Sequence, residues 1–270
     1  MVGVVIPARD EADGIAATVT ALRGLPKIAA VVVVDDGSLD GTGALARTAG
    51  ADVVRHVRNR GKAAALETGA ARIAVLEAAT TGLDAPAWPL LFVDADLGAT
   101  AANTGVLVEP VLDGLADMTI AVLPVQSRPG GGRGFVVKLA RRGIVRATGW
   151  TPTQPLSGMR CLTREAFEAA RPLAHGWGVE TGLTIDLLTA GYRVLEVPAD
   201  LRHRVTGSDW RGRLHRVRQY RDVARGLATR QVRRATPLRL LRRLTPHGSR
   251  DAGSGGPDGG PGQVTGHGRP

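Results

Sequence analysis

The first half of the chain alternates short runs of β-branched residues with longer alanine-rich stretches. The short runs predict β-strands at residues 2–6, 29–35, 51–57, 90–94 and 118–123. The longer stretches predict helices at 11–23, 42–49 and 62–79, which Gly24, Gly50 and Gly82 are expected to end. This alternation is typical of an α/β fold, in which helices flank a mostly parallel sheet.

Beyond Pro124 the pattern is less regular. A loop rich in Pro, Gly and Arg at 126–134 precedes a predicted helix at 135–146. The remaining elements are expected at 156–162, as helices at 163–170 and 180–190, and as a strand pair within 192–203. The arginine-rich, periodically apolar segment 210–246 predicts amphipathic helices interrupted at Pro237, and the Gly, Pro and Ser residues of 247–270 predict a disordered tail.

The composition predicts a core built from aliphatic side chains. Hydrophobic residues make up 43% of the 270 residues and aromatic residues only 3%, which suits buried parallel strands. Cys161 is the only cysteine, so an internal disulfide and a cysteine-rich zinc site are excluded, and a reducing compartment is indicated. We find no secretion signal and no run near the roughly 20 apolar residues of a membrane span. A cytoplasmic protein is therefore expected, with any membrane contact peripheral.

The formal net charge of +10 is concentrated in one segment. Fifteen arginines and two aspartates lie between Arg202 and Arg250, whereas residues 1–201 carry 19 basic and 21 acidic side chains. The segment is interpreted either as a helix face that packs on the core or as a peripheral docking site for anionic lipid at the inner membrane surface. Nucleic-acid binding is not favoured, because Trp210 and Tyr220 are too few to stack bases.

The candidate chemistry lies where the predicted strands end. In a parallel sheet the carboxyl ends of the strands share one edge, and ligands bind beside that edge. Asp94-Ala95-Asp96 follows one strand, and alternation along an extended chain turns Asp94 and Asp96 to the same side. Neighbouring carboxylates are hard oxygen ligands suited to Mg²⁺ or Mn²⁺, and the alternative is that one aspartate caps the next helix.

Two further strand ends carry polar residues. Asp35 and Asp36 close a buried strand, where a carboxylate can accept a hydrogen bond from a nucleobase or a ribose, and Asp40 or Thr42 can cap the following helix. The segment 59–62 (NRGK) opens the next helix, where backbone N–H groups and a lysine suit a base carbonyl or a phosphate. A surface turn would look similar, so this segment alone does not decide between the two.

Together these segments resemble family 2 glycosyltransferases of the GT-A fold, which is a Rossmann-like α/β fold. The resemblance covers about residues 1–125 and rests on the order and spacing of 5–11 (VIPARDE), 34–42 (VDDGSLDGT), 59–62 and 94–96 (DAD). It implies that Asp96 is a catalytic residue and a metal ligand. It also implies a nucleotide-sugar site formed by Pro7, Ala8, Glu11, Asp36, Gly61, Lys62, Asp94 and Ala95.

The second half is similar to the acceptor region of polyprenyl-phosphate sugar transferases and, around 178–180, of glucosyl-3-phosphoglycerate synthases. The similarity rests on 157–160 (SGMR), 176–183 (GWGVETGL) and 201–204 (LRHR). It implies an acceptor site at Ser157, Gly158 and Arg160. It also implies a second metal ligand at His203, although a histidine at a strand end is more often a surface or capping residue.

These resemblances imply a divalent-metal-dependent transfer of a sugar from a UDP- or GDP-linked donor to a lipid phosphate or a phosphorylated small molecule. The metal and nearby cations would stabilise the departing nucleoside diphosphate. Glu180, at a predicted helix start, is the candidate acceptor contact or catalytic base of an inverting enzyme. The likeness to the phosphoglycerate transferases implies retention instead, without such a base, so the stereochemistry stays open.

The predicted organisation is a GT-A catalytic domain over 1–209, with a nucleotide-sugar half (1–125) and an acceptor half (126–209). The basic helical extension (210–246) and the tail (247–270) follow. A homodimer formed through the helices of the second half is left open. Two other functions also remain: a sugar-nucleotide pyrophosphorylase, which needs a basic Gly-rich loop where this chain is acidic, and a non-catalytic GT-A scaffold with a basic binding tail.

Overall fold

The computed structural model describes residues 1–81, 85–124, 134–203 and 227. They all belong to one compact unit, Met1–Arg233, and a second unit, Arg234–Pro270, lies outside them. The predicted basic extension, apart from Leu227, and the predicted tail therefore lie outside the described residues, as do Gly82 and most of the predicted loop at 126–134. Within the described residues, no helix has the length and apolar character needed to cross a membrane.

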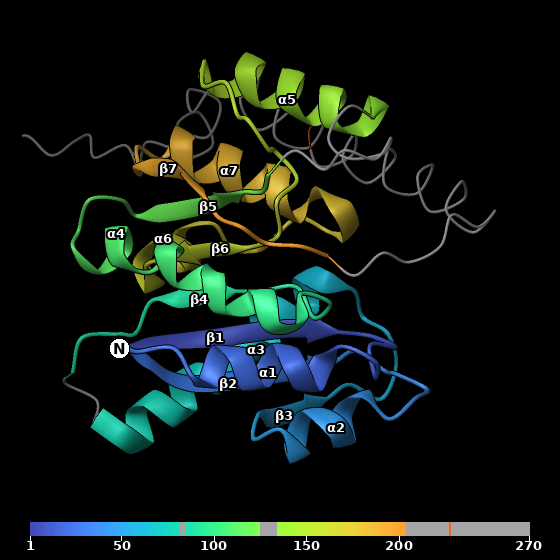
Figure 1. Cartoon of the computed structure of the whole chain (residues 1–270). Helices are drawn as coiled ribbons and strands as arrows, with labels where there is room; N and C mark the ends of the chain where they lie inside the picture. The colour runs from blue at the N-terminus through green and yellow to red at the C-terminus, as the bar shows by residue number, and fades with distance from the viewer. Residues whose placement is uncertain (82–84, 125–133, 204–226, 228–270) are drawn as a thin grey trace, which may run out of the picture. The chain divides into compact units, whose positions relative to one another are not determined.

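One seven-stranded sheet organises these residues. Its strands are β1 (Val2–Ala8), β2 (Ile28–Asp35), β3 (Asp52–Arg55), β4 (Leu90–Phe92), β5 (Met118–Val122), β6 (Arg160–Leu162) and β7 (Val194–Pro198). Their order across the sheet is β3-β2-β1-β4-β6-β5-β7 (Figure 1). Neighbours run parallel, except that β6 runs antiparallel to both β4 and β5. The predicted mostly parallel sheet is thus confirmed.

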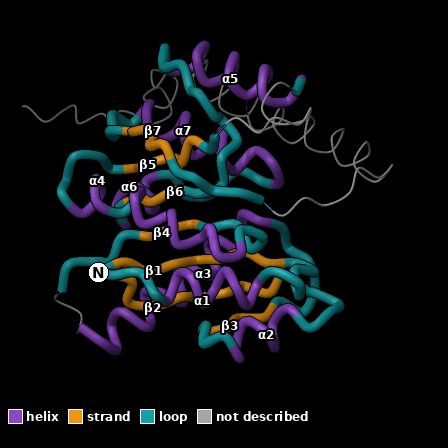
Figure 2. Tube along the Cα trace, viewed as in Figure 1, coloured by secondary structure: helices purple, strands orange, loops and turns teal. Residues whose placement is uncertain are grey.

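Helices cover both faces of the sheet (Figure 2). One face carries α1 (Ile15–Arg23), α2 (Thr42–Thr48), the 3₁₀-helix η1 (Gly98–Leu107) and α4 (Glu109–Leu112). The other face carries α3 (Lys62–Thr81), α6 (Arg164–Ala169), the short 3₁₀-helix η2 (Gly176–Gly178) and α7 (Val179–Thr189). The remaining helix, α5 (Phe135–Thr148), packs on α7.

Side-chain alternation along β1 explains the two layers. Val4 and Ile6 join the apolar cluster of α1, whereas Val5 joins that of α3. Because both faces are covered, the strand is an almost continuous apolar run. The core is mainly aliphatic, as the composition predicts, and Phe92 and Phe167 add an edge-to-face pair with ring centres 5.8 Å apart.

The strands and helices predicted for the first half are confirmed to within a few residues. Gly24 follows α1 in a right-handed conformation, and Gly50 follows α2 with a φ of 93°, which glycine adopts without strain. The helix predicted from residue 11 begins only at Ile15, and the backbone N–H of Glu11 instead donates to the side chain of Thr42. The three helices predicted for the second half are α5, α6 and α7.

The second half differs from the prediction in three places. The strand pair expected within 192–203 is the single strand β7, because the next residues turn to η1, where Asn103 donates to the Asp200 carbonyl at 2.7 Å. Within 156–162 only Arg160–Leu162 form a strand, since Ser157 N closes a turn on the Gln154 carbonyl. Finally, the short 3₁₀-helix η2 is not predicted in the second half, and η1 and α4 are not predicted in the first half.

Candidate active site

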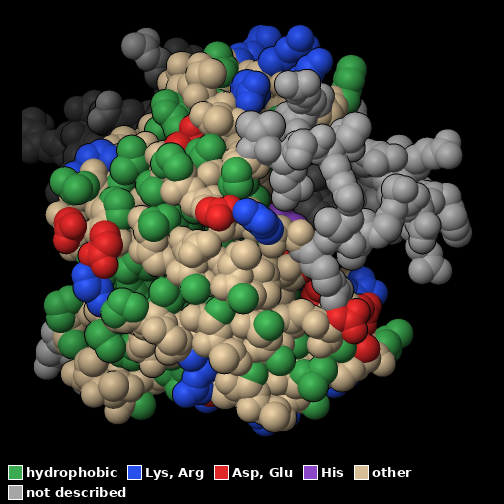
Figure 3. All heavy atoms as spheres, viewed as in Figure 1, with side chains coloured by type: hydrophobic (Ala, Val, Ile, Leu, Met, Phe, Trp, Pro, Cys, Tyr) green, Lys and Arg blue, Asp and Glu red, His purple; other side chains and the backbone are tan. Residues whose placement is uncertain are grey.

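The strands β1, β2 and β4 run parallel and end at the same edge of the sheet. At that edge Ala8 of β1 pairs with Asp35 of β2. Figure 3 shows acidic side chains gathered on this side of the molecule, at the right of the view. The segments that the sequence singles out therefore meet at one edge, which is where ligands bind in such sheets.

The loops after β1 and β2 are tied to each other by hydrogen bonds from backbone to side chain. Ser38 Oγ accepts from Asp10 N at 3.1 Å, and Thr42 Oγ1 accepts from Glu11 N at 2.9 Å. Asp40 accepts from Thr42 N, at the first residue of α2, at 2.9 Å. The first two hydrogen bonds join the loops on one side of the site, and the third lies within the loop after β2.

Asp36 holds the turn that precedes α3. It is 5% exposed and accepts from Arg60 N and Gly61 N, both at 2.8 Å, and from His56 Nδ1 at 2.7 Å. Burial alone would raise the pKa of Asp36, but these hydrogen bonds outweigh it and hold the pKa below its ordinary value. The sequence reasoning missed His56, whose other ring nitrogen lies 3.0 Å from Thr68 Oγ1. A single histidine just after a strand carries no periodic signal that would have found it.

Lys62, the first residue of α3, joins two carboxylates from distant parts of the chain. Its Nζ lies 2.8 Å from Asp94 Oδ1, just beyond β4, and 2.8 Å from Glu180 Oε1, in the first turn of α7. Burial favours the neutral forms, but the attraction between the groups outweighs it, so the pKa of Lys62 is raised and that of Asp94 is lowered. Lys62 and Asp94 are therefore a charged pair at neutral pH.

Asp96 and His203 form a second pair beside this cluster. His203 Nδ1 lies 2.9 Å from Asp96 Oδ1, and both side chains are partly exposed. The hydrogen bond to Asp96 raises the pKa of His203 against the effect of burial. A carboxylate oxygen is a ligand that Mg²⁺ or Mn²⁺ favours, and a neutral imidazole nitrogen is a common metal ligand, so the two residues fit a divalent metal ion.

The predicted acceptor residues lie at different depths. A Cβ at Gly158 would be 2.5 Å from Asp94 Oδ2 and 2.7 Å from Lys62 Nζ, so any other residue there would displace these two side chains. Ser157 is 7% exposed, and its hydroxyl has no hydrogen-bond partner in the part of the chain that the structure describes. Arg160 is 1% exposed, and its guanidinium donates to groups of the protein itself.

The four other predicted nucleotide-sugar residues lie at the ends of β1 and β4. Ala8 and Ala95 are buried, so they can meet a ligand mainly through their backbone. Pro7 and Glu11 are half-buried. All the predicted residues except the buried Arg160 thus come to one edge, and their contacts with substrates stay predictions.

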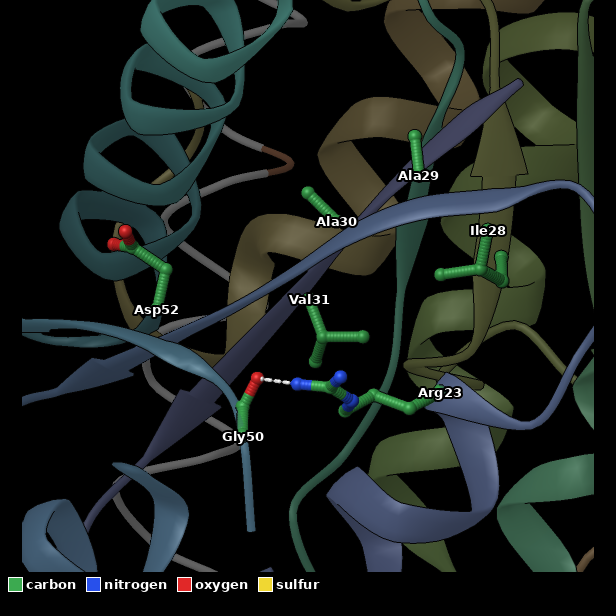
Figure 4. A pocket seen from close by; sticks show the side chains of 7 residues that line it. All are labelled: Arg23, Ile28, Ala29, Ala30, Val31, Gly50 and Asp52. Atoms are coloured by element: carbon green, nitrogen blue, oxygen red, sulfur yellow. Dashed lines mark hydrogen bonds between the residues drawn. The ribbon is translucent and has the colours of Figure 1, made fainter. Parts of the chain in front are cut away.

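The cavity shown in Figure 4 lies elsewhere. It has a volume of about 220 Å³ and is lined by the first residues of β2 together with Arg23, Gly50 and Asp52. Arg23 donates to the Gly50 carbonyl beside it. Because the start of β2 is the opposite end of the strand from Asp35, this cavity has no part in the site at the carboxyl edge.

Comparison with known proteins supports the resemblance seen in the sequence. The model of the family described as glycosyl transferase family 2 matches residues 3–169. Glycosyltransferase AglJ of Haloferax volcanii is 31% identical over 214 residues, which are 76% of this chain and 64% of AglJ. The chain therefore spans slightly less than two thirds of the length of this curated relative.

Solved structures of glucosyl-3-phosphoglycerate synthase from Mycobacterium tuberculosis are also similar. The complex with Mn²⁺, UDP and phosphoglyceric acid is 28% identical, with 85% of this chain and 78% of that chain covered and a TM-score of 0.64. The complex with Mg²⁺ and UDP is 27% identical, with 85% and 79% covered and a TM-score of 0.65. A complex with Mn²⁺, UDP-glucose and phosphoglyceric acid is 28% identical, with 85% and 79% covered and a TM-score of 0.64.

Since the family match covers more than half of the chain, and the sheet and its helices match these structures, the chain belongs to glycosyl transferase family 2 and has a GT-A-like fold.

Proposed function

We propose that the chain transfers a hexosyl group from a UDP-linked sugar to a phosphorylated small molecule, with Mg²⁺ or Mn²⁺ as cofactor. The observation that carries this proposal is the Asp96–His203 pair beside the Lys62 cluster, at the edge of the sheet where ligands bind. The three solved structures described above hold UDP or UDP-glucose with Mn²⁺ or Mg²⁺, and two of them also hold phosphoglyceric acid.

Asp96 and His203 would hold the metal together with oxygen atoms of the substrate. Among the residues that the structure describes, no three His, Cys, Asp or Glu side chains gather in a metal-binding arrangement. Two protein ligands suit an ion that completes its shell with diphosphate oxygens and water. When bound, the metal supplies positive charge beside the diphosphate leaving group.

Lys62 adds a fixed positive charge at the same edge. Its ammonium group is held between Asp94 and Glu180, so it is oriented before a substrate arrives. The start of α3 adds the partial positive charge of a helix N-terminus. Asp36 and Gly61 shape the neighbouring turn for the nucleotide.

The ion pair of Glu180 bears on the stereochemistry. Glu180 is 4% exposed and bonded to Lys62, which supports a role in orienting the lysine rather than in taking a proton from the acceptor. We therefore infer that the configuration at the anomeric carbon is retained. The anomeric proton coupling in an NMR spectrum of the product measures this directly, and an inverted product would restore Glu180 as the base.

The turnover of the full chain with UDP-glucose, Mn²⁺ and 3-phosphoglycerate tests the proposal. Release of UDP and a product of the expected mass should require both metal and acceptor. Parallel reactions replace the donor with GDP-mannose or the acceptor with a polyprenyl phosphate. Transfer to the polyprenyl phosphate alone would move the acceptor to the lipid class.

Two further reactions separate the other functions. Formation of UDP-glucose and pyrophosphate from UTP and glucose 1-phosphate would favour a pyrophosphorylase. If calorimetry detects no binding of UDP or GDP with Mn²⁺, the chain is a non-catalytic scaffold.

Three further predictions accompany the proposal. Cell fractionation would test a cytoplasmic location, vesicle sedimentation would test peripheral membrane contact through 210–246, and light scattering would test a homodimer.

A further inference from the structure

Arg160 is an arginine in the middle of a sheet. It lies on β6, level with Phe92 of β4 on one side and Ile120 of β5 on the other. The residue is 1% exposed, and burial lowers the pKa of Arg160 to about 10. A buried cation is unfavourable unless the protein supplies partners for it, so its contacts indicate what it is for.

The guanidinium of Arg160 joins two separate segments. Nε donates to the Ser157 carbonyl at 2.9 Å, and Nη2 lies 3.4 Å from the Pro155 carbonyl, both in the turn that leads into β6. Nη1 donates to Thr184 Oγ1 at 2.8 Å, on α7. One rigid, planar group therefore fixes the turn relative to the helix.

Both of these segments carry a part of the candidate active site. The turn ends at Gly158, where a Cβ would collide with Asp94 and Lys62. On the helix, Thr184 Oγ1 donates to the Glu180 carbonyl at 2.9 Å, and the Glu180 carboxylate binds Lys62. A small shift of either segment would thus change the distances around Lys62.

We propose that Arg160 is a positioning residue of the transfer reaction, which holds the 155–158 turn and the first turns of α7 at the separation that lets Lys62 reach Asp94 and Glu180 together. This inference rests on the proposed function. From the sequence, Arg160 is expected to contact the acceptor directly. In this proposal it instead acts indirectly, by positioning Gly158 and Glu180. Arg160 also places a positive charge near the carboxylates of Glu180, Glu196 and Asp94.

Steady-state kinetics of full-length variants test the proposal. Arg160→Met should lower kcat by about 100-fold and change the KM of the acceptor by less than about threefold, because misplaced groups slow the reaction without removing a binding contact. Arg160→Lys keeps the positive charge and part of the hydrogen bonding, so its kcat should be about tenfold higher than that of Arg160→Met. Thr184→Val keeps the shape and removes only the link to α7, and it should lower kcat by about tenfold.

Arg141→Met is the matched control. Arg141 binds the carbonyls of Pro152 and Thr153, in the same connection between α5 and β6, but neither contact reaches α7. This variant should keep kcat within about threefold of the wild-type value. Thermal unfolding and the affinity for UDP with Mn²⁺ are measured for every variant. If Arg160→Met fails to fold, Arg160→Lys and Thr184→Val decide the question.

Four results would overturn the inference. An acceptor KM that rises while kcat stays constant would show direct contact with the acceptor. Wild-type kcat in both Arg160→Lys and Thr184→Val would show that the link to α7 has no effect on the reaction. A kcat as low in Arg141→Met as in Arg160→Met would show a general loss of structure. A wild-type chain that binds UDP but transfers no sugar would remove the proposed function, and this inference with it.

Discussion

The charges at the sheet edge are arranged by the protein before any substrate binds. Lys62 has two carboxylate partners, each carried by a different element, and its pKa is raised by them. Lys62 is therefore positively charged at neutral pH. The Asp96–His203 pair differs, because both side chains are partly exposed, and under the proposed function the pair would exchange its mutual hydrogen bond for a metal ion.

Replacing Asp96 by Asn should abolish metal-dependent turnover, with a loss on the order of 100-fold or more in kcat/KM, because a neutral amide oxygen is a weaker ligand than a carboxylate. The measurement is turnover as a function of Mn²⁺ concentration. The thermal unfolding midpoint should change little, since the Asp96 side chain is partly exposed. Full activity of this variant would remove Asp96 from the mechanism.

Gly158→Ala should lower kcat by about tenfold or more, because the new methyl group would push Asp94 and Lys62 apart. Turnover at saturating substrate measures the effect. Gly134→Ala is a matched control, since a Cβ at Gly134 meets nothing within 4 Å. Equal activity of the two variants would contradict the close approach of Gly158 to the cluster.

Among the secondary-structure elements, α3 brings Lys62 to the edge, and its position depends on one glycine. The helix packs across β1 and β2, and a Cβ at Gly69 would lie 2.2 Å from Val5 Cγ1. The alanine-rich sequence of α3 allows this close packing, which fixes the start of the helix beside the strand ends. Helix periodicity predicts α3, but it does not reveal how closely the helix approaches the sheet.

Gly69→Ala should destabilise the chain by about 1–3 kcal/mol, because overpacking against Val5 outweighs the better helix propensity of alanine. Chemical denaturation measures the change in the free energy of unfolding. Ala71→Gly, at an exposed site on the same helix, should cost at most about 1 kcal/mol through propensity alone. A stabilised Gly69→Ala variant would show that α3 packs less closely than described.

For the molecule as a whole, several aspartates link stability to acid pH. The pKa of Asp52 is lowered by its hydrogen bond to Arg72, that of Asp117 by its hydrogen bond to Arg193, and that of Asp36 by bonds that outweigh its burial. An unfolded aspartate titrates near pH about 3.9. As the pH falls below this value the unfolded chain binds protons first, so the stability that these groups contribute is present above it and is lost as the pH falls through their folded pKa values.

The free energy of unfolding should therefore fall steeply below about pH 4, while these groups contribute no slope between about pH 5 and 7. Denaturant unfolding at a series of pH values measures this dependence. Asp36→Asn removes one of the groups and should show a smaller loss between about pH 5 and 3. An equal loss in the variant and the wild-type chain would show that Asp36 is not part of the effect.

By itself, the sequence determined the strands of the first half, the helices α1, α2 and α3 but not η1 and α4, and the strand ends that carry polar residues. Strand alternation and helix periodicity are local properties, and parallel strands end at a common edge, so the position of the site followed from local patterns. The family followed from the same segments, because their order and spacing are specific even though each segment alone is not.

Only the tertiary structure decided which side chains meet. The two carboxylate partners of Lys62 are distant from it in the sequence, and His56 contacts Asp36 across the fold. Neither contact is predicted by strand alternation or helix periodicity. From the sequence, Arg160 is expected to contact the acceptor. In the structure it is buried, because its strand β6 lies between β4 and β5. Burial and partner choice depend on the packing of distant elements, and this packing is absent from any local stretch of sequence.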